Sequence, residues 1–217
     1  YVEYLYEKLG DKGMFTAPTG THDEVRMPTQ KSPDLIKCIF AFMLTLKQVP
    51  MIYYGDEIGM EHNYSVSKDG GGKRTGARTP MQWTAEKNAG FTTADEPWFE
   101  INPNYTEINV EAEQNNPHSI LNYYKKLLKF RKENDIVKYG DFELLKTQKE
   151  IFAYVRKYEG QKMLVLCSFT DKETTFRAPK DFDMEAAELV LWNYDNNPVI
   201  HNGFMTRPYE TRVYLFD

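Results

Sequence analysis

Residues 32–55 read SPDLIKCIFAFMLTLKQVPMIYYG, and this stretch indicates the fold class of the first part of the chain. Ser32-Pro33-Asp34 is a typical helix start, with a capping hydroxyl, a proline at the first helical position and an acid in the first turn. The predicted helix runs to about Lys47, and its second half is apolar almost all round, which indicates deep burial. Pro50 prevents its continuation, and residues 51–54 form an apolar predicted strand.

The residues before this stretch show the same order of elements. Residues 2–9 place apolar side chains at helical spacing, and residues 13–17 form a short predicted strand. Helix, strand, helix, strand is the alternation typical of parallel strands joined by helical crossovers. Two parallel strands alone would leave both sheet edges unpaired and could not cover their apolar faces, so we expect more protein in front of this chain.

Residues 61–117 show no sustained periodicity and are interrupted by four prolines and five glycines. A structureless segment of that length is usually either functional or disordered. This one carries Trp83, Phe91, Trp98 and Phe99, a composition that does not suit disorder. We therefore expect an ordered excursion near a binding site.

A second helix is predicted from Asn116-Pro117 to about Asn134, and after it the apolar period changes from helical spacing to two. Alternating residues separated by turn signals predict short strands. The predicted strands are Tyr139–Leu145, Ile151–Tyr158, Lys162–Phe169, Glu173–Arg177, Ala187–Trp192 and Thr211–Phe216. The sequence thus predicts an α/β part over residues 1–135 and an all-β part, an antiparallel β-sandwich of Greek-key type, over residues 136–217.

Charge and hydropathy exclude some classes of partner. The formal net charge is −5, and no run of lysine and arginine is long enough to follow a phosphate backbone, so no nucleic acid partner is expected. No segment approaches the roughly 20 apolar residues of a membrane helix. Cys38 and Cys167 lie in apolar runs and are expected to be buried free thiols, which permits a reducing compartment and a cytoplasmic location.

Several short motifs follow one another in fixed order and together resemble one enzyme family. They are Thr21-His22-Asp23-Glu24-Val25-Arg26, Tyr53-Tyr54-Gly55-Asp56-Glu57-Ile58-Gly59-Met60, Arg74-Thr75-Gly76-Ala77-Arg78-Thr79-Pro80-Met81-Gln82-Trp83 and Asn88-Ala89-Gly90-Phe91. Each motif is weak alone, but the ordered set resembles the α-amylase superfamily, glycoside hydrolase family 13, and within it the oligo-1,6-glucosidase and α-glucosidase branch. The resemblance covers essentially the whole chain.

The resemblance implies an eight-stranded β/α barrel of the TIM type followed by an all-β C-terminal domain. Residues 13–17 would be the seventh barrel strand, residues 51–54 the eighth, and the helix from Pro117 the last barrel helix. Barrel strands one to six would then lie upstream. The chain would be the C-terminal portion of the enzyme, and its partners would be the missing N-terminal barrel portion and a small oligosaccharide.

Enzymes of this family hydrolyse glycosides with retention, using a nucleophile and a proton donor that lie on earlier strands. A third carboxylate, which helps to distort the sugar toward the transition state, matches Asp23. This residue lies just past a predicted barrel strand, where such barrels keep their catalytic groups. Its charge could also raise the pKa of the donor acid. Taken alone, Asp23 would be read as a solvated loop aspartate.

The resemblance assigns substrate-binding roles to His22, which would donate to a sugar hydroxyl, and to Arg74, which would reach the glucosyl ring. Arg26 is predicted to contribute as a carboxylate partner at the pocket. A histidine beside an aspartate could instead be a pair that fixes the loop, and metal binding would need more ligands than the segment offers. No cofactor is implied, and the calcium site of some family members lies upstream.

The remaining charged and aromatic residues of these motifs are assigned to structure. Arg78 and Trp83 are expected to hold the long loop to the barrel rim, and Glu57 is expected to be a structural carboxylate. The sequence also departs from the family pattern, because Thr75 and Gly76 replace the usual aspartate and asparagine. The glycines at 70–72 lack the serine or threonine and the preceding strand of a phosphate-binding loop.

The predicted function is that of a retaining α-glucosidase acting on short α-glucosides, oligo-1,6- or α-1,4-linked. The isolated chain would be inactive because it lacks two of the three carboxylates. Transglycosylating relatives, such as sucrose isomerases and trehalose synthases, are an alternative within the same fold. A non-catalytic, transporter-associated homologue and a carbohydrate-binding module are alternatives of other classes.

Overall fold

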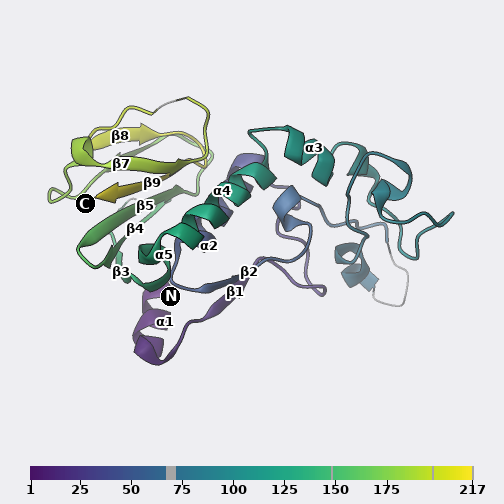
Figure 1. Ribbon diagram of the computed structural model, residues 1–217, viewed down its shortest axis with the longest axis horizontal. Helices are drawn as coiled ribbons and strands as arrows, with labels where there is room; N and C mark the ends of the chain where they lie inside the picture. The colour runs from purple at the N-terminus through teal and green to yellow at the C-terminus, as the bar shows by residue number, and fades with distance from the viewer. Residues whose placement is uncertain (67–71, 148, 197, 217) are drawn as a thin grey trace. The chain divides into compact units, whose positions relative to one another are not determined.

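The computed structural model describes residues 1–66, 72–147, 149–196 and 198–216 (Figure 1). The chain packs as two compact units, each treated separately below. The strand unit comprises residues 1–16, 37–49 and 125–217, and the loop unit comprises residues 17–36 and 50–124. These units describe packing within this chain, so the predicted domain boundary at 135/136 stays a prediction.

The predicted order helix, strand, helix, strand is confirmed at the start of the chain: α1 (Val2–Leu9), β1 (Thr16–Pro18), α2 (Pro33–Thr45) and β2 (Val49–Met51). At the start of α2, the Ser32 hydroxyl accepts from Leu35 N at 3.3 Å, as the capping sequence predicts. Both strands are shorter than predicted and displaced. Pro18 and Pro50 lack the N–H that a longer ladder would need.

Strands β1 and β2 form a two-stranded sheet (Figure 1). Val49 N donates to Phe15 O at 3.0 Å, and Thr19 N donates to Met51 O at 2.9 Å. These partners advance in the same direction along both segments, which identifies the pair as parallel. The carboxyl ends of both strands therefore lie at one edge.

The C-terminal residues are strands, as their period of two predicts. A five-stranded sheet has the order β3-β4-β5-β9-β7, and β6 pairs with β8 in a second sheet; all these neighbours are antiparallel. The bounds are β3 Asp141–Leu144, β4 Ile151–Tyr158, β5 Gln161–Ser168, β6 Thr174–Arg177, β7 Glu188–Trp192, β8 Gly203–Thr206 and β9 Thr211–Phe216. Strand β8 was not predicted, because its residues read as a turn at Asn202-Gly203.

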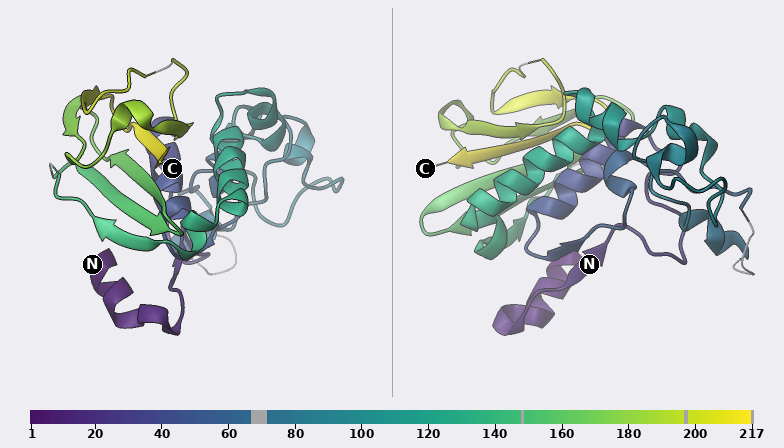
Figure 2. Two further views of the ribbon diagram at one scale, coloured as in Figure 1. Left: turned by 60° about the vertical axis from the view of Figure 1, so that its left-hand side comes forward. Right: turned by 45° about the vertical axis from the view of Figure 1, so that its right-hand side comes forward.

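One apolar core joins the two sheets of the strand unit. Val155 of β4 lies opposite Leu164 of β5, and both belong to a buried cluster that also contains Phe176 of β6. Cys38 and Cys167 are free and fully buried, as predicted. Within this unit, the end of α2 and the helix α4 (Ile120–Glu133) lie side by side next to the sheet (Figure 2).

Two arginines close the C-terminal end of α2, where helix carbonyls have no partner within the helix. Arg131 Nη1 donates to Leu44 O at 2.8 Å and to Leu46 O at 3.0 Å. Arg156, fully buried on β4, donates to Thr45 O at 2.8 Å and to Gly140 O at 2.7 Å. Both guanidinium groups are cationic and lie at the negative end of the helix dipole, which stabilises them there.

The predicted excursion over residues 61–117 is ordered where the structure describes it. It contains short 3₁₀ turns, among them Gly72–Ala77 and Pro103–Thr106, and a short helix α3 (Val110–Asn115) that the sequence did not predict. Met81 of this excursion belongs to a buried apolar cluster of the loop unit that also contains Ile58, Met60 and Leu121. A further short helix, α5 (Asp135–Tyr139), lies in the strand unit and precedes β3. Most of the glycine-rich stretch before Arg74 lies outside the described residues.

Candidate active site

Asp23 lies in a turn five residues after β1. Its backbone N donates to the Thr21 hydroxyl at 3.2 Å, and Glu24 N donates to Thr21 O at 3.3 Å. Thr21 therefore fixes the turn from both sides, as threonine commonly does through its hydroxyl. The Asp23 side chain keeps 44% of its surface exposed, so its carboxylate is available to a ligand.

Three basic side chains surround the Asp23 carboxylate. Arg78 Nη2 donates to Asp23 Oδ1 at 2.9 Å, and Arg74 Nη1 donates to the same oxygen at 3.3 Å. His22 Nε2 lies 3.4 Å from Oδ2. The structure thus brings together His22, Asp23 and Arg74, three of the four predicted site residues, over about 50 positions of sequence. Oδ1 is held by both guanidinium groups, which leaves Oδ2 as the oxygen more open to a ligand.

Arg78 is the closest partner of Asp23, although the sequence assigned it to loop structure. Its Nε also donates to His22 O at 3.1 Å, so one guanidinium contacts both residues of the His22-Asp23 pair. The sequence contained no clear signal for this role. Arg74 lies in the 3₁₀ turn Gly72–Ala77 and Arg78 directly follows that turn, so the direction of each side chain depends on the local path of the backbone. These contacts are compatible with the predicted structural role of Arg78 and also with a role of Arg78 at the site.

A glycine lets the loop that carries both arginines approach its neighbour. We call residues 72–79 the arginine loop. A Cβ at Gly76 would lie 2.2 Å from Asn63 O and 2.5 Å from His62 Nε2, so only glycine fits without a backbone shift. Asn63 N donates to Gly76 O at 3.1 Å at the same point. The departure of Gly76 from the family's asparagine therefore coincides with a close backbone contact.

Arg26, the fourth predicted site residue, is buried. Its guanidinium carbon lies 4.8 Å from the Tyr53 ring centroid and 4.5 Å from that of Tyr54, and Nη1 donates to Tyr54 O. Nη1 is 3.7 Å from Asp56 Oδ1, so Arg26 does face a carboxylate. Its side chain has no exposed surface, and within this chain its contacts are with protein groups.

The buried pair includes a carboxyl group with a shifted pKa. Burial raises the pKa of Asp56 from 3.8 to about 6, against the opposing effects of the nearby Thr19 hydroxyl and the Arg26 guanidinium. The carboxylate oxygens of Asp56 make no hydrogen bond with any residue that the structure describes. Burial likewise raises the pKa of Glu57, which fits its assignment as a structural carboxylate.

Tyr53 and Tyr54 connect the Arg26 cluster to the arginine loop. Tyr53 Oη donates to Ala77 O at 3.0 Å, and Tyr54 Oη donates to Thr79 O at 2.7 Å. The two bonds flank Arg78 in the sequence. Arg26 fixes the tyrosine rings, the tyrosines fix the backbone on both sides of Arg78, and Arg78 orients Asp23.

Trp83 is half exposed and is attached through its backbone, whose N donates to Ala89 O at 2.9 Å.

Within the described ranges, no group of three or more histidine, cysteine, aspartate and glutamate side chains is arranged to hold a metal ion. No helix in the described part of the chain is long and apolar enough to span a bilayer.

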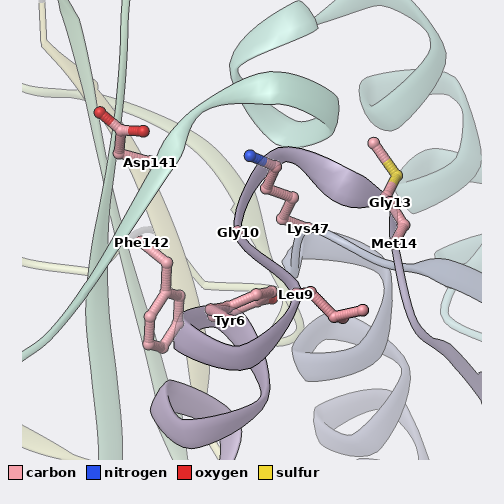
Figure 3. A pocket seen from close by; sticks show the side chains of 8 residues that line it. All are labelled: Tyr6, Leu9, Gly10, Gly13, Met14, Lys47, Asp141 and Phe142. Atoms are coloured by element: carbon pink, nitrogen blue, oxygen red, sulfur yellow. The ribbon is translucent and has the colours of Figure 1, made fainter.

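A separate cavity of about 180 Å³ lies in the strand unit (Figure 3). The Tyr6 ring lines it beside Phe142, with ring centroids 4.8 Å apart, and burial raises the pKa of Tyr6 to about 12. Lys47 and Asp141 contribute the charged groups of the lining. None of the predicted site residues is among the residues that line this cavity.

Comparisons with known proteins identify the family of the chain. The family model described as alpha amylase, catalytic domain, matches residues 3–140. The oligo-1,6-glucosidase of Halalkalibacterium halodurans is 35% identical over 95% of this chain and 43% of that protein. The oligo-1,6-glucosidase of Bacillus cereus is 48% identical over 65% of this chain and 25% of its own length. The chain thus spans less than half the length of these relatives.

Solved structures of other proteins have a backbone similar to that of this chain. Trehalose-6-phosphate hydrolase of Bacillus licheniformis matches with a TM-score of 0.88 and 31% identity, covering 100% of this chain and 46% of that one. Isomaltulose synthase from Klebsiella sp. LX3 matches with a TM-score of 0.86 and 27% identity, covering 99% of this chain and 45% of that one. Since the family model covers well over half of the residues, the chain belongs to the alpha-amylase family.

Proposed function

We propose that this chain is the C-terminal part of a retaining α-glucosidase that hydrolyses short α-glucosides, with α-1,6 or α-1,4 linkages. The observation that carries the proposal is the half-exposed Asp23 carboxylate after β1, held through one oxygen by Arg78 and Arg74. Relatives named oligo-1,6-glucosidases match nearly the whole chain, which supports the same substrate class.

In the proposed enzyme, β1 and β2 are the seventh and eighth strands of a β/α barrel, α4 is the last barrel helix, and residues 136–217 form a Greek-key β-sandwich. The parallel pairing of β1 with β2 and the helix between them support the barrel assignment. Asp23 and Gly55 follow the carboxyl ends of these strands, and active sites of such barrels are built at that end.

Asp23 stabilises the transition state in this proposal. The nucleophile and the proton donor lie upstream, so the chain alone is inactive. Oδ2 accepts a hydrogen bond from a hydroxyl of the glucosyl ring, while Arg78 and Arg74 keep Oδ1 in place. Because the carboxylate is oriented before the sugar binds, little reorganisation is needed when the ring distorts toward its oxocarbenium-like state. His22, 65% exposed, donates to a neighbouring hydroxyl.

Sugar transfer is a second candidate, and one observation favours it: the backbone also matches isomaltulose synthase and trehalulose synthase. Both reactions use the same glycosyl-enzyme chemistry and differ in whether water or a sugar hydroxyl accepts the glucosyl group. Analysis of the products that the full-length enzyme makes from sucrose and from isomaltose separates the two candidates.

The proposal is tested by Asp23→Asn in the full-length enzyme. We expect kcat for p-nitrophenyl α-glucoside to fall by about 100-fold or more, because the amide cannot replace the charge that faces the transition state. Glu24→Gln is the matched control, since it removes one negative charge from an exposed neighbour. Equal rates for the wild type and Asp23→Asn, with both proteins folded, would refute the assignment.

A further inference from the structure

Asp56 contacts both ends of the turn that carries Asp23. At one end, a Cβ added to Gly20 would lie 3.6 Å from Asp56 Oδ2, so the carboxyl group lies next to the Gly20 backbone. At the other end, Arg26 Nη1 is 3.7 Å from Asp56 Oδ1. Gly20 precedes Asp23 by three residues and Arg26 follows it by three. One buried side chain therefore supports this segment of the candidate active site from both sides.

The contacts of Asp56 are formed entirely by residues of the loop unit. The side chains of Asp56 and Arg26 have no exposed surface, and further protein in a longer chain can only cover more surface. The backbone of Asp56 is held as well, because its N donates to Tyr53 O at 3.1 Å at the start of the 3₁₀ turn Asp56–Ile58. The position of the carboxyl group is thus defined within this chain.

The geometry around Asp56 suits a neutral carboxyl group. A guanidinium and an ionised carboxylate form hydrogen bonds of about 2.7–2.9 Å. Arg26 Nη1 is farther away than that and donates to Tyr54 O instead. Neither carboxyl oxygen of Asp56 makes a hydrogen bond with any residue that the structure describes. A buried carboxylate without hydrogen bonds is far more unfavourable than a neutral carboxyl group.

The groups that face Asp56 act on its charge in opposite directions. Burial has the largest effect and raises the pKa of Asp56 to about 6. The Thr19 hydroxyl and the Arg26 guanidinium lower that pKa, and the adjacent Glu57 carboxylate raises it. Tyr53 stays neutral, because burial raises its pKa to about 12. Asp56 is therefore the group of this cluster that changes its charge near neutral pH.

We propose that Asp56 is a positioning residue for Asp23 and that the neutral form of its carboxyl group holds the active arrangement. Ionisation leaves a buried anion beside Arg26, so the guanidinium moves toward it and away from Tyr54 O. The Arg26 guanidinium carbon lies 4.5 Å from the centroid of the Tyr54 ring, and the Tyr54 hydroxyl donates to Thr79 O in the arginine loop. The movement therefore shifts both the Asp23 turn and the arginine loop. This inference rests on the proposed function and adds a residue that acts through Arg26.

The test is the pH dependence of kcat for p-nitrophenyl α-glucoside in the full-length wild type and in Asp56→Asn. The amide has the size and polarity of the neutral carboxyl group but does not ionise. We expect similar kcat values at pH 5. Between pH 5 and 8 the wild-type kcat should fall by about tenfold relative to that of the variant, because displaced positioning groups slow the reaction. Catalytic groups that titrate in both proteins cancel from this ratio.

Glu57→Gln is the matched control, because it neutralises the adjacent carboxyl group, whose pKa burial also raises. This variant should keep the pH dependence of the wild type. A ratio of the wild-type and Asp56→Asn kcat values that stays constant from pH 5 to 8 overturns the inference, even if the melting temperatures differ. An Asp56→Asn protein that does not fold also overturns it, because the amide replaces the neutral form that the proposal requires.

Asp23→Asn, measured in the same assay, separates this inference from the proposed function. Full activity of Asp23→Asn refutes the proposed function itself. Loss of activity in Asp23→Asn together with a constant ratio for Asp56→Asn refutes the positioning role of Asp56 alone.

Discussion

Gly76 is the position where the smallest substitution should disturb the candidate site most. In Gly76→Ala the new Cβ would lie 2.2 Å from Asn63 O and 2.5 Å from His62 Nε2. The first contact is with backbone, which cannot rotate away as a side chain can. The hydrogen bond from Asn63 N to Gly76 O, 3.1 Å long, holds the two segments together at that point and must lengthen or break.

The expected cost follows from this geometry. Overpacking with one methyl group typically costs about 1–3 kcal/mol, and the lost hydrogen bond adds roughly 1 kcal/mol. We therefore expect the free energy of unfolding to fall by about 2–4 kcal/mol. The arginine loop must shift to relieve the clash, so Arg74 and Arg78 move relative to Asp23. A displacement on the order of 1 Å in a positioning group can lower kcat/KM by about 100-fold.

Urea unfolding of the full-length protein and kinetics with p-nitrophenyl α-glucoside measure the two effects. The matched control is Gly13→Ala, because Gly13 has extended backbone and no atom within 4 Å of an added Cβ. Gly76→Asn, which restores the residue usual in the family, should be at least as damaging as Gly76→Ala. If Gly76→Ala unfolds with the free energy of the wild type and keeps full kcat/KM, the close contact does not position the site.

Two more predictions concern the groups that support Asp23. Because the pKa of Asp56 rises from 3.8 to about 6 on folding, its proton is bound more tightly in the folded state, so its stabilising contribution is complete below pH 4 and is lost as the pH rises through 6. Between pH 4 and 7 the free energy of unfolding of the wild type should fall by roughly 3 kcal/mol, whereas that of Asp56→Asn should not. Parallel pH profiles of the two proteins would contradict this prediction. Arg78→Lys cannot make the contacts of Arg78 with Asp23 Oδ1 and His22 O together. It should lower kcat about tenfold with little change in melting temperature, and a melting temperature that falls with kcat unchanged would show a structural role only.

Elements with repeated apolar positions or clear turn signals on both sides were predictable from the sequence, including the four-residue strands β3 and β6. The short elements α3, α5 and β8 were not predicted. The helices α1, α2 and α4 and the strands β4, β5, β7 and β9 carry repeated apolar positions, which report the buried face directly. The helix α3 has six residues and depends on a local contact, in which Asn109 Oδ1 accepts from Ala112 N at 2.8 Å. Strand β8 has four residues and begins at Gly203, and the pair Asn202-Gly203 reads as a turn signal in the sequence.

Only part of the candidate site was predictable from the sequence, because the contact of Arg78 with Asp23 was not expected. Motif order brings His22, Asp23 and Arg74 together, and the structure places them in contact. Which arginine lies nearer to Asp23 depends on the path of the arginine loop, and that path depends on the contact of Gly76 with residues 62–63. The burial of Arg26 could not be predicted either, because a sequence does not show that two tyrosine rings pack against its guanidinium group.

The central claim is that Asp23 holds a glucosyl ring through the oxygen that the arginines leave open. A crystal structure of the full-length enzyme with bound glucose measures this directly. The account predicts a sugar hydroxyl within about 3 Å of Asp23 Oδ2 and Arg78 still bound to Oδ1. Glucose bound elsewhere in the enzyme, or an Asp23 side chain that points away from the bound ring, would contradict it.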